Sequence, residues 1–183
     1  MYNFYLMNNQ IYFGGGCFWC VEAIFIKIRG VLNVVPGYIG GNTENPTYKD
    51  ICTGQTGHAE VIKITYNQSE ISLKDLLEIF FSTHDPTTIN RQGNDVGTQY
   101  RSSIFTNDKK EIEIINKFIV TLDQKKVFKS KIVTTIENKL NFFKAEEYHQ
   151  NYYELNKEAP YCSIVIAPKL KKLLKSGSKF VKN

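Results

Sequence analysis

The stretch QIYFGGGCFWCVEAIFIKIRG, Gln10 to Gly30, holds a strand pattern, a glycine-rich turn and a helix pattern in direct succession. Gln10–Phe13 predicts a short strand that ends in three glycines. The residues after the cysteines predict a helix that ends at Gly30, because their apolar positions have helical spacing. Those positions are Val21, Ile24, Phe25 and Ile28. Cys17 therefore stands where a strand passes through glycines into a helix.

Strand and helix patterns alternate along the rest of the chain, without an internal repeat or a linker. Further strands are predicted over Val31–Gly41, His58–Tyr66, Arg101–Phe105 and Ile132–Ile136. Helices are predicted over SLKDLLEIFFSTHDP after a Ser72 cap, over Asp108–Leu122 and over AEEYHQNYYELN, followed by an extended segment APYCSIVIAP. This order predicts an α/β (α+β) fold with a mixed sheet flanked by helices.

The whole chain, 1–183, is expected to form a single domain, with a core of about residues 10–168 and a Lys-rich tail over 169–183. Irregular sequence is concentrated in Gly37–Gly57, in Thr87–Tyr100 and in the C-terminal segment. Long loops inside a compact domain often carry function. We therefore expect a site to be built from these loops and from the end of the first strand.

The composition is that of a globular protein, with 42% hydrophobic and 22% charged residues. No apolar run approaches the roughly 18 residues of a membrane span, and the N-terminus lacks the features of a signal peptide. We therefore expect a cytoplasmic protein without a membrane partner. The net charge of +5 belongs to the tail, which holds six Lys and no acid. A solvated tail is favoured over a nucleic-acid surface.

Local features favour Cys17 as a nucleophile. The unpaired N–H groups of a helix start favour a thiolate and are expected to lower the pKa of this thiol. The preceding glycines let the backbone turn tightly and let a substrate approach closely. The alternative is a buried cysteine that packs a helix start.

Two other kinds of site use the same Cys-x-x-Cys spacing. A zinc site could recruit Cys52, Cys162 and His58, but the chain has no second closely spaced ligand pair. A thioredoxin-like disulfide exchanger would fit the strand-to-helix position of the cysteines. It would leave unexplained the polar residues Glu60, Asp95, Tyr100 and Arg101, which favour a small-molecule site.

Five motifs in this order resemble those of the peptide methionine sulfoxide reductase A family. They are GGGCFWC with the following EA and F, PGYIGGNTENPTY, TGHAEVIKITY, HDPTTINRQGNDVGTQYRS and AEEYHQNYY. The resemblance extends from about Gln10 to Lys175. It implies a ferredoxin-like plait or roll with a long irregular C-terminal segment. It also implies reduction of methionine S-sulfoxide, free or in proteins, to methionine, in repair of oxidised proteins.

The resemblance also implies roles for single residues. Cys17 matches the cysteine that attacks the sulfoxide sulfur, and Glu60 matches the acid that protonates the sulfoxide oxygen. Tyr48 and Tyr100 match two phenols that orient this oxygen, and Asp95 matches a residue lining the same pocket. Burial in an apolar pocket would keep the Glu60 carboxyl protonated near neutral pH.

Phe18 and Trp19 match the apolar wall that receives the methyl group of the substrate. The resemblance implies no cofactor and no metal, but an external dithiol reductant, thioredoxin. The partners expected are therefore methionine sulfoxide and thioredoxin, with no nucleic acid, and we expect a monomer.

Attack on the sulfoxide would leave Cys17 as a sulfenic acid, which a second thiol must resolve to a disulfide. Two cysteines remain candidates for this step. Cys162 resembles a mobile tail cysteine of the family, and Cys20 occupies a position that some members use. Cys52 is predicted to be a buried structural thiol. The three histidines are predicted to be structural and satisfied by hydrogen bonds: His58, His84 and His149.

Overall fold

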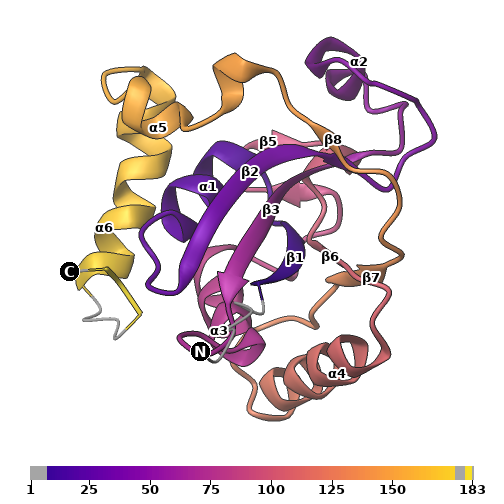
Figure 1. The fold of residues 1–183 in the computed structure, drawn as a ribbon, viewed down its shortest axis with the longest axis vertical. Coiled ribbons are helices and arrows are strands. Elements are labelled where there is room, and N and C mark those ends of the chain that lie inside the picture. The colour runs from indigo at the N-terminus through magenta and orange to yellow at the C-terminus, as the bar shows by residue number, and fades with distance from the viewer. Residues whose placement is uncertain (1–7, 176–179, 183) are drawn as a thin grey trace, which may run out of the picture.

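A six-stranded sheet runs through the centre of the molecule in the order β7-β6-β1-β3-β2-β8 (Figure 1). The computed structural model describes residues 8–175 and 180–182. The strands of the sheet are β1 (Asn8–Gly14), β2 (Val31–Ile39), β3 (Ala59–Asn67), β6 (Ser103–Phe105), β7 (Thr135–Glu137) and β8 (Phe143–Lys144). Only β6 and β7 pair in parallel. The predicted mixed sheet is therefore confirmed.

Helices flank this sheet and complete the predicted fold class. They are α1 (Phe18–Phe25), α2 (Tyr48–Cys52), α3 (Leu73–Thr83), α4 (Lys109–Gln124), α5 (Tyr152–Leu155) and α6 (Ala167–Lys175). The succession β1-α1-β2-β3-α3-β6, with strand order β6-β1-β3-β2, is the split βαβ arrangement of ferredoxin-like folds. The predicted Ser72 cap is confirmed, since Ser72 and Asp75 form a capping box at the start of α3.

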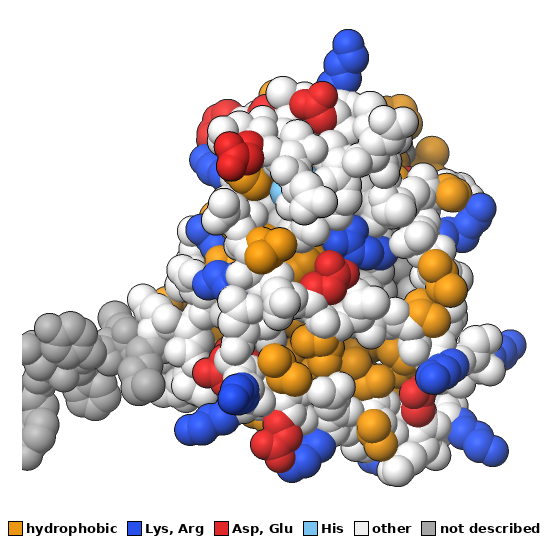
Figure 2. Space-filling model, turned by 90° about the vertical axis from the view of Figure 1, so that its right-hand side faces the viewer, with side chains coloured by type: hydrophobic (Ala, Val, Ile, Leu, Met, Phe, Trp, Pro, Cys, Tyr) orange, Lys and Arg blue, Asp and Glu red, His pale blue; other side chains and the backbone are white. Residues whose placement is uncertain are grey.

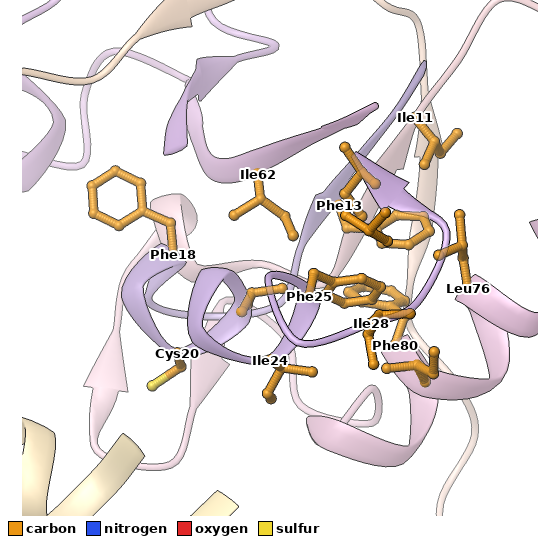
Figure 3. Packing of buried hydrophobic residues seen from close by; sticks show 14 of the residues in the cluster. Ile11, Phe13, Phe18, Cys20, Ile24, Phe25, Ile28, Ile62, Leu76 and Phe80 are labelled. Carbon is orange, nitrogen blue, oxygen red and sulfur yellow. The ribbon is translucent and has the colours of Figure 1, made fainter. Parts of the chain in front are cut away.

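The two faces of the sheet are buried differently because successive strand residues point to opposite sides. In β1, Ile11 and Phe13 join the main hydrophobic cluster under α1 and α3, where Phe13 stacks on Phe80 at 4.6 Å between ring centroids (Figure 3). Tyr12 faces the other side and belongs to a smaller cluster with Val61 and Phe105. The large core thus lies on the side of the sheet that carries α1.

Four loops meet at one end of the sheet, as the strand register requires. Glu60, at the start of β3, pairs with Tyr38 near the end of β2. Gly14, which ends β1, pairs with Ser103, which begins β6. The chain segments that follow β1 and β2 and those that precede β3 and β6 therefore lie together, although they are far apart in sequence. Cys17, Tyr48, Glu60 and Tyr100 come from these segments.

The prediction of one helix over Ala145–Asn156 is wrong. The segment contains a 3₁₀ turn, η2 (Glu147–His149), and the short helix α5, separated by Asn151 in the left-handed conformation with φ of 53°. The N–H groups of Asn151 and Tyr152 donate to the side chain of Glu22 rather than within a helix. The contact with Glu22, which is distant in sequence, therefore interrupts the helix that the local pattern predicts.

The predicted extended segment over 159–168 is also wrong. A π-helical turn, η3 (Cys162–Ile166), leads directly into α6. The β-branched residues of this segment favoured a strand, whereas the buried residues have helical spacing: Cys162, Ile166, Leu170 and Leu173. These side chains belong to the main core cluster, and η3 and α6 contact α1. Part of the stretch expected as a Lys-rich tail is therefore a helix with a buried face.

The long loop between α3 and β6 contains structure that its sequence did not reveal. A two-stranded hairpin, β4 (Arg91–Gln92) with β5 (Asp95–Val96), is followed by a 3₁₀ turn, η1 (Thr98–Tyr100). Such short elements leave no periodic pattern to detect. The predicted loop before β3 likewise contains the single-turn helix α2, whose Thr47 cap forms a capping box with Asp50.

Charges of both signs are mixed on the face of the molecule shown in Figure 2, where Lys and Arg side chains lie among acidic ones. Within the residues that the structure describes, no helix has the length and apolarity needed to cross a membrane.

Candidate active site

Cys17 lies at the junction of β1 and α1, and a glycine makes this junction possible. Gly16 has φ of +87°, and a Cβ atom there would overlap the side chain of Gln92. Cys17 then occupies the N-cap position of α1 without making a capping hydrogen bond through its side chain. The thiol is 8% exposed and lies at the end of the sheet where the four loops meet.

Glu60 faces the first turn of α1 from the start of β3. The Phe18 N–H donates to Glu60 Oε2 at 3.1 Å, and the Glu60 side chain is buried. Burial raises the pKa of this carboxyl to about 8, against the opposing effect of the Phe18 N–H. Because Oε2 accepts a hydrogen bond, the proton of the neutral carboxyl belongs on Oε1. The structure thus holds a proton donor beside Cys17.

The expected lowering of the Cys17 pKa is wrong for the substrate-free protein. Burial raises the pKa of this thiol well above its usual value, and the charge of Glu60 raises it further. The N–H groups of a helix start do not outweigh the loss of solvent around a buried sulfur. Cys17 therefore rests as a thiol.

Tyr48 and Tyr100 approach Glu60 from two other loops. Burial raises the pKa of both phenols, and the charge of Glu60 raises it further in each case. The charges of Cys17 and Asp95 also raise the pKa of the Tyr100 phenol. Both hydroxyl groups are therefore protonated at all relevant pH values and can donate hydrogen bonds, although the Tyr48 hydroxyl interacts with the Cys52 thiol in the substrate-free protein.

An aromatic group adjoins these polar residues. The Phe18 ring lies 6.5 Å from that of Tyr48 with 19° between their planes. The Trp19 ring stacks on that of Tyr152 at 3.7 Å and 6°, and its Nε1–H donates to His149 Nδ1 at 3.1 Å. Since Phe18 is buried and Trp19 is partly exposed, the indole forms the outer part of this apolar wall.

Asp95 reaches the site through Tyr161. The Tyr161 hydroxyl donates to Asp95 Oδ2 at 2.8 Å and lies 3.8 Å from Cys20 Sγ. The charge of Asp95 raises the pKa of Glu60 and of Tyr100. The structure therefore brings together every residue predicted to act on the substrate.

The two candidate resolving cysteines occupy different places. Interaction with the Cys17 thiol lowers the pKa of Cys20 to about 7, with Lys169 adding to the effect. Figure 3 shows Cys20 on the opposite side of α1 from Phe18, directed toward the C-terminal helical segment. Cys162 is fully buried in η3; burial raises the pKa of its thiol, and the charge of Cys20 raises it further. Cys20 therefore lies between Cys17 and Cys162.

The prediction that Cys52 is buried is wrong, since its thiol is exposed at the end of α2. A single-turn helix leaves its last residue outside the core. The prediction for His58 is confirmed, because its ring accepts from the Gly41 N–H and pairs with the Thr43 carbonyl. It is also confirmed for His84, whose ring nitrogens pair with Phe80 O and Ser102 Oγ.

His149 differs from the other two histidines. Its Nδ1 is engaged by Trp19, but its buried Nε2 has no hydrogen-bond partner. Glu146 Oε2 lies 3.9 Å away, beyond hydrogen-bond range. The prediction of a fully satisfied histidine is therefore wrong at this position. Within residues 8–175 and 180–182, the structure contains no cluster of three or more potential metal ligands.

Three acidic or phenolic residues of the site were missed in the sequence: Glu22, Glu146 and Tyr161. The Glu146 carboxylate accepts from the Tyr38 hydroxyl at 2.9 Å and from the Tyr48 N–H at 2.7 Å, and so joins β2 to α2. Glu22 offered a signal, since it is the one acidic residue in the mostly apolar helix predicted after Cys17. Tyr161 offered none, because its segment was expected to be extended.

Comparison with known proteins agrees with this arrangement. The sequence profile of the family described as "Peptide methionine sulfoxide reductase" matches residues 9–180. A curated protein from Trichodesmium erythraeum, "Peptide methionine sulfoxide reductase MsrA", is 52% identical over 169 residues, which are 92% of this chain and 96% of that protein.

Two solved structures from Saccharomyces cerevisiae also resemble the chain. The structure of Mxr1 in reduced form is 36% identical, with a TM-score of 0.79 over 85% of this chain and 89% of that one. The structure of Mxr1 in complex with Trx2 is 28% identical, with a TM-score of 0.56 over 79% and 84%.

The raised pKa of Glu60 predicts how the stability of the fold depends on pH. Between the ordinary carboxyl pKa of 4.5 and about 8, the folded protein holds a proton that the unfolded chain releases. This contribution to the free energy of unfolding is therefore complete below pH 4.5 and is lost as the pH rises through 8, by at most about 1.4 kcal/mol per pH unit. Glu60→Gln should remove this part of the slope in urea unfolding between about pH 5.5 and 8.5. The exposed variant Glu44→Gln should keep the wild-type slope; an unchanged slope in Glu60→Gln would contradict the assignment.

Proposed function

This chain belongs to the peptide methionine sulfoxide reductase family and reduces methionine sulfoxide to methionine, and we propose that Cys17 is the nucleophile of this reaction. The observation that carries the proposal is the pairing of the Cys17 thiol with a buried, proton-bearing carboxyl on one end of the sheet. A sulfoxide needs both groups, because its sulfur becomes electrophilic as its oxygen accepts a proton. We propose the S epimer as the substrate, free or in proteins.

In the first step, the Cys17 sulfur forms a bond to the sulfoxide sulfur while Glu60 Oε1 gives its proton to the sulfoxide oxygen. The oxygen then passes to Cys17, the bond between the two sulfurs breaks, and methionine leaves. The Cys17 thiol proton returns to the Glu60 carboxylate, so that the step converts a thiol and a sulfoxide into a sulfenic acid and a thioether. The raised pKa of both groups supports this proton balance.

Tyr48 and Tyr100 would donate hydrogen bonds from their hydroxyl groups to the sulfoxide oxygen. Asp95 would line the same pocket and accept the hydrogen bond of the Tyr161 hydroxyl. The proposal is supported by the charge of Glu60, which raises the pKa of both phenols. Phe18 and Trp19 would receive the methyl group, since they form the apolar wall next to Cys17. No metal and no organic cofactor is needed for this chemistry.

The sulfenic acid would be resolved first by Cys20. Its thiol interacts with that of Cys17 and has a pKa of about 7, so an attacking thiolate is available near neutral pH. Attack releases water and forms a Cys17–Cys20 disulfide. Cys162, which adjoins Cys20, would then receive the disulfide by exchange after η3 unwinds.

A thioredoxin-class dithiol would reduce the final disulfide and become oxidised in turn. The complex of Mxr1 with Trx2 supports this partner. A cytoplasmic location is part of the same proposal, since the four cysteines are unpaired thiols in the structure and a reducing compartment preserves thiols.

Cys17→Ser should abolish reduction of methionine S-sulfoxide, because a hydroxyl oxygen is a much weaker nucleophile than sulfur and cannot be oxidised to a sulfenic acid. Loss of methionine formation is measured by chromatography with a dithiol reductant. The matched variant Cys52→Ser replaces an exposed thiol by a hydroxyl that can still accept a hydrogen bond from Tyr48, and it should retain wild-type turnover. Turnover that survives in Cys17→Ser would refute the nucleophile assignment.

Glu60→Gln should slow the chemical step in single-turnover experiments by roughly 100-fold, the usual contribution of a positioned acid. The ratio of the wild-type rate to the variant rate follows the protonated fraction of Glu60. It should therefore be constant below pH 8 and fall as the pH rises above about 8. A ratio that does not change with pH would remove Glu60 from the acid role.

One turnover without reductant should leave a Cys17–Cys20 disulfide in a protein whose Cys162 is replaced by Ser, since Cys20 is the thiol next to Cys17. Peptide mapping by mass spectrometry identifies the bond. In Cys20→Ser, the sulfenic acid should persist longer and be detected with a sulfenate-specific reagent. Rapid Cys17–Cys162 bonding in the Cys20→Ser variant would show that Cys20 is not required.

A further inference from the structure

We propose that Glu22 is a positioning residue for substrate binding, acting through the backbone of residues 151–152 on the orientation of Trp19. The inference rests on the proposed role of Trp19 as part of the wall that receives the substrate. Glu22 lies on α1, one turn after Phe18, and its side chain is 2% exposed.

The Glu22 carboxylate binds a segment more than a hundred residues away in sequence. Oε1 accepts the Asn151 N–H at 2.6 Å, and Oε2 accepts the Tyr152 N–H at 3.2 Å. Asn151 has left-handed backbone angles, φ of 53° and ψ of 34°, so two successive N–H groups turn toward one carboxylate. Figure 1 shows α5 at the outer side of α1, where this contact is made.

The segment held in this way carries the groups that fix the indole. The Tyr152 ring lies parallel to the Trp19 ring at 3.7 Å, and His149 accepts the Trp19 Nε1–H at 3.1 Å. An indole has one N–H donor and makes its largest contacts through its ring faces. The orientation of Trp19 is thus set by neighbours whose backbone is tied to Glu22.

Burying the Glu22 carboxylate costs free energy, which would not be expected of a residue that serves packing alone. Burial raises the pKa of its carboxyl to about 7, and the two backbone N–H groups oppose this effect. The open hollow beside it is also lined by Lys144 and Lys182, but neither is its ion-pair partner among the described residues. An apolar residue of similar size would avoid this cost but would leave the N–H groups of Asn151 and Tyr152 without an acceptor. These two hydrogen bonds therefore explain why a carboxylate occupies this buried position.

Trp19 would contact the methyl group of the substrate and not the oxygen that is protonated. Loss of its orientation should weaken binding of the substrate and of the transition state alike. Such a change raises KM and leaves kcat nearly unaltered.

The experiment compares Glu22→Gln with Glu154→Gln. Glu22 joins α1 to the start of α5, whereas Glu154 of α5 forms ion pairs with Lys27, two residues after the end of α1, and with Lys157, and is partly exposed. Trp19 is the single tryptophan of the chain, so its fluorescence reports the indole directly in the substrate-free protein. Glutamine keeps the size of Glu22 but turns an amide N–H₂ toward a backbone N–H, so that one hydrogen bond is lost.

Glu22→Gln should shift the Trp19 emission and increase its quenching by acrylamide. It should raise KM for methionine S-sulfoxide about 10-fold with kcat changed less than about two-fold, as expected when one charge-assisted hydrogen bond is lost. Glu154→Gln should leave the emission and both kinetic constants unchanged. An unaltered emission in Glu22→Gln, or a fall in kcat at constant KM, would overturn the proposal.

Tyr152→Leu provides a second test, which also applies if Glu22→Gln fails to fold. It removes the ring stacked on Trp19 and should alter the emission and raise KM in the same direction. In the double variant, KM should not exceed that of the more affected single variant, because both act through one contact. Unchanged KM in Tyr152→Leu, or effects that multiply, would refute the inference. The fluorescence is read without substrate, so this result is independent of whether Cys17 is the nucleophile.

Discussion

The hydrogen bond from the Phe18 N–H to the Glu60 carboxyl connects the two halves of the site. It joins the first turn of α1 to the first residues of β3, at the end of the sheet where β1 and β2 finish. Because Cys17 directly precedes Phe18, the same bond fixes the distance between the thiol and the acid. The glycine turn before Cys17 serves this geometry, since a side chain at Gly16 would meet Gln92.

Burial then determines the chemistry of the groups so placed. The same loss of solvent keeps the Glu60 carboxyl and the Cys17 thiol in their neutral forms. Two neutral hydrogen donors cost less to bury than a charged pair. In the proposed mechanism, proton transfer would begin when the sulfoxide oxygen lies next to Glu60.

The sequence was sufficient for the central fold because each of its elements has a clear period. The β3 alternation and the α3 pattern after Ser72 lie where they were predicted, whereas the helix after Cys17 is present but ends at Phe25 and not at Gly30. The C-terminal third was not predictable in this way. The helix break at Asn151 depends on Glu22, and the helix through Cys162 depends on packing against α1. Likewise, the rise in the Cys17 pKa follows from burial, which the helix-start argument did not include.

The helix α6 sets limits on which changes this chain can tolerate. Leu170 and Leu173 are buried in the main core, while Lys171 and Lys172 between them are exposed. The positive charge and the covering of the core therefore come from different residues of this short helix. The basic isoelectric point of the chain, about 8.9, could be redesigned by altering the outward lysines without disturbing the interior. A chain shortened to residue 168 would instead expose part of α1 to water, so α6 covers the core and is not a dispensable tail.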